Sequence, residues 1–149
     1  MRAFCLTLAA LAIMSSTTQS YAGPSKDAAS SPWKAGTIWA VLVFGPDHKL
    51  VGSMVIRVTN APADSCIAGT WNRVDVLRYQ SDDPRFLAKR PLSYALDGDA
   101  LTLGANEICD AYLHLHGTLA NEAATGDYES KGLRGPNYLG SFAAVLVQD

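Results

Sequence analysis

The 149-residue chain lacks the motifs that identify common enzyme and cofactor sites. It has no Gly-x-Ser-x-Gly nucleophile turn, no phosphate-binding Walker loop and no dinucleotide fingerprint. Its nearest approach, the stretch 132–135 (GLRG), lacks the Lys-Ser/Thr pair that holds phosphate. An enzyme is therefore the less favoured interpretation, and we assign no catalytic residue.

Charge of either sign is also sparse, with 12 basic and 14 acidic side chains and a net charge of −2. This balance offers no electrostatic attraction to nucleic acid. No apolar run beyond the first 22 residues approaches the length of a membrane-spanning helix. We expect no nucleic-acid partner and no membrane span in the protein after export.

The first residues predict an export signal. Arg2 precedes an apolar run at 3–14, and Ser20 and Ala22 place small side chains before a cleavage site. The run is too short to span a bilayer. We expect that residues 1–22 are a signal peptide and that the protein is periplasmic or secreted. A retained membrane anchor is the alternative.

Cysteine is scarce. Once Cys5 leaves with the signal peptide, Cys66 and Cys109 remain. Two cysteines in an exported chain predict one disulfide bond. It would close a loop of roughly 44 residues and stabilise the fold by about 4 kcal/mol. Two buried free thiols are the alternative.

The rest of the chain carries a β pattern and no convincing helical period. Residues 23–34 are rich in Gly, Pro, Ser and Ala and predict a flexible leader, followed by one domain at 35–149. Runs of β-branched and aromatic residues between turn signals predict eight strands. These strands are 36–44, 50–59, 66–79, 92–96, 100–104, 107–120, 127–130 and 138–147.

Short connections between eight strands favour an all-β, mainly antiparallel domain. Hairpin-linked strands can close into an up-and-down barrel, which removes exposed edges and leaves a small interior. A two-sheet β-sandwich is the alternative.

Short motifs resemble the small lipocalin-like and avidin-like barrels. Gly69-Thr70-Trp71 has the Gly-x-Trp spacing of the lipocalin opening, and 36–39 (GTIW) is similar. The stretch 126–130 (GDYES) resembles an avidin-type strand, and Gly140-Ser141-Phe142 resembles the start of a closing strand. In lipocalins Gly-x-Trp lies in the first strand, whereas here it falls in about the third. The resemblance implies a calycin-type β-barrel and transfers no ligand-binding residue.

The stretch 108–117 (ICDAYLHLHG) holds two of the three histidines. Successive side chains of a strand point to opposite faces. One face is apolar, so we expect it in the core with Cys109 pointing inward, and we expect His114 and His116 to point outward. The outward face carries Ile108, Asp110, Tyr112, His114 and His116, and the inward face carries Cys109, Ala111, Leu113, Leu115, Gly117 and Leu119.

Two imidazoles two residues apart on one strand face can share a divalent metal ion. Zinc needs three or four protein ligands, and Asp127 or Glu129 on the next strand is the best source of a third. A metal site at His114 and His116 is therefore one hypothesis. An ordinary exposed polar face and a pH-sensitive contact surface are the alternatives. We expect no other cofactor.

Two polar loops carry apolar residues that are costly to expose. The loop 81–91 places Phe86 and Leu87 next to Arg85, and the loop 131–137 places Leu133 between two cations. Loops on a rigid scaffold commonly carry binding residues. We therefore expect a binding surface, unless the first loop folds its apolar pair back over the barrel end. The expected binding residues are Arg85, Phe86, Leu87, Lys131 and Arg134.

Export, small size, the β pattern and the missing catalytic motifs together favour a non-enzymatic binding module that acts through its loops or through an open barrel end. Its partner would be a protein, as for small exported inhibitors, or a small apolar ligand. A metal-binding protein or metal-dependent enzyme built on the His-x-His strand is one alternative. A structural envelope protein is the other.

Overall fold

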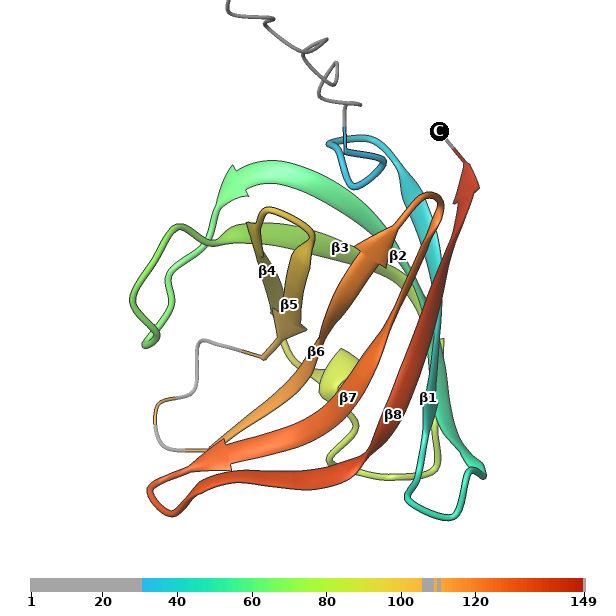
Figure 1. Cartoon of the computed structure of the whole chain (residues 1–149), viewed down its shortest axis with the longest axis vertical. Helices are drawn as coiled ribbons and strands as arrows, with labels where there is room; N and C mark the ends of the chain where they lie inside the picture. Colours follow the sequence, from blue (N-terminus) through green and yellow to red (C-terminus); the bar gives the residue numbers. More distant parts are fainter. Residues whose placement is uncertain (1–30, 106–108, 110, 149) are drawn as a thin grey trace, which may run out of the picture.

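The computed structural model describes residues 31–105, 109 and 111–148. Its eight strands close into an antiparallel barrel in which each strand pairs with the next and β8 returns to β1 (Figure 1). The strands are β1 (Ile38–Phe44), β2 (Leu50–Pro62), β3 (Asn72–Gln80), β4 (Leu92–Asp97), β5 (Ala100–Gly104), β6 (Ala111–Ala120), β7 (Ala123–Gly132) and β8 (Gly135–Gln148). A short 3-10 helix, η1 (Leu87–Lys89), lies between β3 and β4.

The predicted all-β, up-and-down barrel is confirmed, and the sandwich alternative is wrong because the eight strands form one closed ring. No helix of the described residues is long and apolar enough to cross a membrane. The turn at 97–99 joins β4 and β5 as predicted, with Gly98 at a φ of 59°. That left-handed conformation is the one that an Asp-Gly pair supplies in a tight hairpin.

Several predicted strand boundaries are wrong. The third strand begins at Asn72, since residues 66–71 form an irregular loop after β2. The seventh strand begins at Ala123 and runs to Gly132, well beyond the predicted 127–130. The predicted loop 131–137 is mostly strand, because β7 and β8 continue into it and leave only Leu133 and Arg134 between them.

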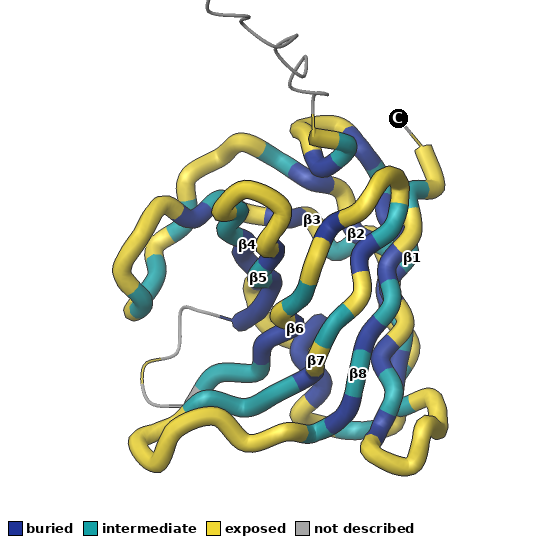
Figure 2. Tube along the Cα trace, viewed as in Figure 1, coloured by how far each residue is buried: buried dark blue, intermediate teal, exposed yellow. Residues whose placement is uncertain are grey.

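The core fills the barrel, and buried residues alternate with exposed ones along the strands (Figure 2). This alternation is expected where one face of a sheet is buried. Trp33 belongs to the same core, with its ring centroid 4.8 Å from that of Trp39 and 5.8 Å from that of Tyr94. The packed part of the chain therefore includes Trp33, which lies within the segment predicted as leader.

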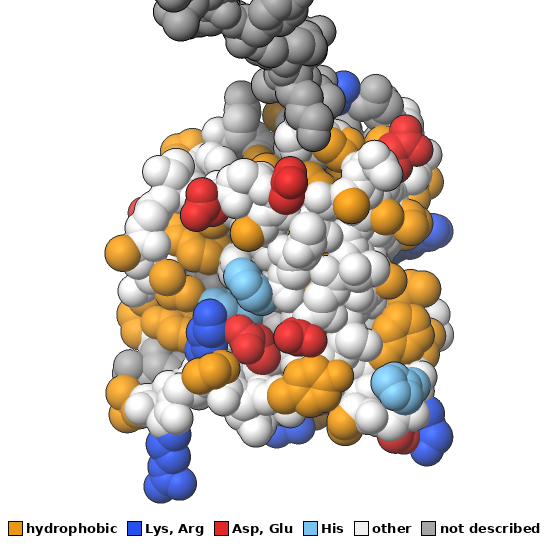
Figure 3. All heavy atoms as spheres, viewed as in Figure 1, with side chains coloured by type: hydrophobic (Ala, Val, Ile, Leu, Met, Phe, Trp, Pro, Cys, Tyr) orange, Lys and Arg blue, Asp and Glu red, His pale blue; other side chains and the backbone are white. Residues whose placement is uncertain are grey.

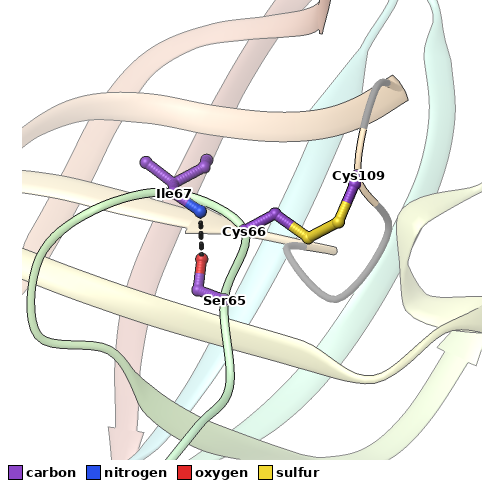
Figure 4. The surroundings of a disulfide bond; sticks show 4 residues. All are labelled: Ser65, Cys66, Ile67 and Cys109. Atoms are coloured by element: carbon purple, nitrogen blue, oxygen red, sulfur yellow. Dashed lines mark hydrogen bonds between the residues drawn. A yellow bond between two sulfur atoms is a disulfide. The ribbon is translucent and has the colours of Figure 1, made fainter.

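The disulfide between Cys66 and Cys109 is confirmed, with the two Cα atoms 5.5 Å apart (Figure 4). The expected inward position of Cys109 is wrong. This residue lies in a turn before β6, which begins only at Ala111, and its side chain is exposed. Cys66 is also exposed, in the loop between β2 and β3. The bond thus joins two surface loops and does not join two strands inside the core.

Candidate binding site at the barrel end

The segment between β3 and β4 folds back into one end of the barrel. Its first residue, Ser81, donates a side-chain hydrogen bond of 2.9 Å to the carbonyl of Val51 on β2. An Asp83 carboxylate oxygen then accepts the backbone N–H of Arg85 at 2.8 Å. These bonds turn the chain so that Phe86 enters the barrel, where its ring lies against Gly52. A side chain at position 52 would occupy the space of this ring.

Phe86 and Leu87 both have an exposed fraction of 0%. Of the two expectations for the loop 81–91, the structure therefore shows the one in which the apolar pair folds back over the barrel end. The two side chains do not form an exposed contact surface, because they find apolar contacts inside the barrel. Arg85 differs from them, since its side chain is 86% exposed.

A pocket of about 570 Å³ opens at this end of the barrel. It brings together segments that are distant in the sequence: the turn after β1, the segment before β4, the start of β6 and the facing parts of β7 and β8. Apolar side chains form much of its wall, including Val51, Leu87, Leu113 and Leu139. The polar groups that line it are Asp83, Arg85, Arg90, Tyr112, Tyr128, Ser130 and Asn137.

Two arginines and one aspartate give the pocket an excess of positive charge. Asp83 already has a partner, because one of its carboxylate oxygens lies 3.5 Å from the Arg85 Nε. Arg90 lines the same pocket and is exposed, and no ion pair links it to a carboxylate among the residues that the structure describes. A guanidinium group in this position can bind an anionic group of a ligand.

Tyr128 is a buried polar residue of the pocket. Burial raises the pKa of its hydroxyl, and the negative charge of Asp83 raises this pKa further. The positive charge of Arg85 lowers it by a smaller amount. The hydroxyl therefore stays protonated at neutral pH and can donate a hydrogen bond to a ligand. The sequence pattern placed Tyr128 in a short strand and offered no signal of a pocket.

The second predicted loop lies at the tip of the β7–β8 hairpin. Leu133 is 93% exposed there. Lys131 lies 3.3 Å from the Glu129 carboxylate, and Arg134 is exposed beside Leu133. None of these three side chains lines the pocket. Of the predicted binding residues Arg85, Lys131 and Arg134, only Arg85 lines the pocket.

The two strand histidines have different surroundings. His116 is exposed, and its Nδ1 lies 3.0 Å from the Thr102 hydroxyl on β5. His114 has the same outward parity, because Leu115 between them lies in the core. Its exposed fraction is nevertheless 0%, so the expectation that it is exposed is wrong. The ring lies over Gly104, which has no side chain to displace it, and stacks on Tyr112 with centroids 5.5 Å apart.

Burial away from water lowers the pKa of His114 to about 4, with smaller effects from the positive charges of Lys131 and His116. His114 is therefore neutral at physiological pH. A neutral imidazole is able to bind a metal, but the ring of His114 is also packed between Gly104 and Tyr112.

Asp127 and Glu129 are the cross-strand neighbours of the histidines, since Glu129 lies opposite His114 and Asp127 opposite His116. Figure 3 shows histidine side chains beside acidic and basic ones on the face of β5 to β7. Within the described ranges, no group of three or more His, Cys, Asp or Glu side chains is arranged to hold a metal ion. The metal site at His114 and His116 stays a prediction.

The fold and the pocket together define a class, that of closed eight-stranded antiparallel β-barrels with a pocket at one end. The chain matches no protein-family model, no curated protein and no solved structure.

Proposed function

We propose that this protein is an exported, non-enzymatic binding module that holds a small amphipathic ligand with an anionic group in the pocket at the barrel end. The pocket is the main observation that supports this proposal. Its volume of about 570 Å³ lies within the range of about 300–1,000 Å³ that small-molecule sites occupy. Its apolar wall suits an apolar ligand body, and Arg90 at its surface suits a carboxylate or a similar anion.

A small ligand is favoured over a protein target at the loop 81–91. Phe86 and Leu87 of this loop are buried, so neither side chain is available to a partner protein. We also propose that the barrel is lipocalin-like or avidin-like, since both classes are up-and-down barrels. Export itself is supported by the signal-like first 22 residues, and it is checked by the N-terminal mass of the protein recovered outside the cytoplasm.

Displacement of a fluorescent, polarity-sensitive probe tests the ligand class. The ligands are dodecanoate and dodecanol, which share the same chain and differ in charge. We expect dodecanoate to bind more tightly, and Arg90→Ala to weaken it at least about tenfold while leaving dodecanol unchanged, because a hydrogen bond to a charged group contributes about 1.5–3 kcal/mol. Arg57→Ala is the matched control, since Arg57 is an exposed arginine of β2 outside the pocket.

Equal binding of the two ligands would contradict the role of the anionic group. Displacement by neither ligand would contradict binding in the pocket. Melting curves of both variants check that the barrel is intact.

A protein contact at the β7–β8 tip is a second candidate function. It is favoured by Leu133, which is 93% exposed at the end of the hairpin. Connecting segments on a rigid scaffold commonly carry binding residues. Cross-linking from position 133 checks this candidate, and a partner lost on Leu133→Ser but retained on Leu50→Ser would support it.

A further inference from the structure

Among the described strands, the junction of β3 with β4 has the fewest paired residues. Only residues 72–74 of β3 pair with residues 92–94 of β4, whereas β6 and β7 pair along the whole of both strands. The residues of β3 from 75 to 80, apart from Leu77, pair with β2 on one side. Within the described part of the chain, no hydrogen bond from another element reaches them on the other side.

This leaves an unpaired strand edge along residues 75–80 of β3. In an antiparallel strand, alternate residues direct their N–H and C=O groups to the two sides. The side of residues 75–80 that faces away from β2 therefore carries unpaired donors and acceptors. All of these residues except Val76 are exposed. Such an edge can pair with another strand.

The side chains along this edge carry complementary charges. Ile56 of β2 lies in the core, so its neighbours Val55 and Arg57 point outward. Their partners on β3 are Arg78 and Asp75, which must also lie on the outer face. The edge thus carries one positive and one negative side chain, three residues apart and both exposed.

We propose that residues 75–80 form a symmetric interface with a second copy of this chain, in which the two β3 edges pair antiparallel. A two-fold axis between Val76 and Leu77 places Asp75 of each copy opposite Arg78 of the other. The two oppositely charged pairs favour this register. A strand of a different protein carrying charges of one sign would match only one of the two side chains.

Apolar surface at the edge adds to the argument. Leu77 is 43% exposed. A register shift between β2 and β3 leaves Leu77 as the extra residue of a bulge, so it has no partner on β2. Pairing with a second copy would cover this side chain as well as the backbone groups.

Sedimentation velocity of the purified protein over a range of concentrations tests this interface. We expect a reversible dimer. Leu77→Lys should raise its dissociation constant at least about tenfold, because each copy would add a charge to the edge. Leu42→Lys is the matched control, since Leu42 is 42% exposed on β1, away from this edge, and we expect it to leave the dissociation constant unchanged.

A charge exchange tests the register. Asp75→Arg alone places like charges opposite each other twice and should weaken the dimer about tenfold, and Arg78→Asp added to it should restore the dimer. A protein that is monomeric at every concentration overturns the proposal, as does a dimer that Leu77→Lys leaves intact. A dimer that the double exchange does not restore overturns the register. Melting curves of each variant separate loss of pairing from loss of fold.

Discussion

At the scale of the residue, His114 combines an outward strand position with complete burial. Its pKa of about 4 in the folded protein lies below the ordinary value of 6.5. A group whose folded pKa is lowered binds its proton more readily in the unfolded chain. Its stabilising effect is therefore present above pH 6.5 and is lost as the pH falls from 6.5 toward 4.

We expect this residue to make the barrel sensitive to acid. Between pH 6.5 and 4, the free energy of unfolding should fall by up to about 3 kcal/mol more in the protein than in His114→Gln. The comparison removes the effect of the carboxylates, which titrate in both proteins. His116→Gln is the control. Because His116 is exposed, this variant should show the same fall in the free energy of unfolding as the unchanged protein. Urea unfolding at several pH values measures the effect, and an NMR titration of His114 near 6.5 would contradict it.

At the scale of the element, the segment before β4 is part of the barrel core. We expect Phe86→Ala to lower the free energy of unfolding by about 3–5 kcal/mol, because it leaves a cavity in the core beside Gly52, which has no side chain to fill it. Tyr79→Ala removes the neighbouring ring, 6.5 Å away and partly exposed, and should cost much less. Urea unfolding measures both variants. Equal losses would show that Phe86 has no special place in the core.

Local signals were sufficient to predict most of the strands. The Asp-Gly pair at 97–98 and the turn residues at 45–47 act through their own backbone preferences, so their effect does not depend on the rest of the fold. The loop at 131–137 shows the limit of this reasoning. Its glycines indicate a loop. Pairing between β7 and β8 nevertheless extends both strands into this segment, so that β7 ends at Gly132 and β8 begins at Gly135.

Contacts between distant segments could not be predicted in this way. The burial of His114 depends on Gly104 of the neighbouring strand, ten residues earlier. Alternation along the strand correctly predicted that the side chain of His114 points outward. It could not predict which residues cover this side chain. The pocket likewise depends on Arg90, Tyr128 and Leu139, which no single stretch of sequence brings together. For the same reason the loop 81–91 allowed two interpretations, and only its packing inside the barrel separates them.

At the scale of the whole molecule, closure of the barrel and the disulfide act on the same region. The chain between Cys66 and Cys109 contains β3, η1, β4 and β5, and so includes the junction of β3 with β4 where pairing is sparse. The bond also ties the loop before β3 to the turn before β6. It therefore limits how far the weakest part of the wall can open.

We expect loss of this bond to lower the free energy of unfolding by about 4 kcal/mol, because a crosslink over this length of chain restricts the unfolded state. Urea unfolding of the protein with and without reductant measures the loss, and the double variant Cys66→Ser, Cys109→Ser should reproduce it. The double variant is also the control, since reductant should leave its stability unchanged. If reductant has no effect on the unchanged protein and its mass shows two free thiols, the bond does not form. If the bond is intact and its removal leaves the stability unchanged, the restriction of the unfolded chain is offset by strain in the folded barrel.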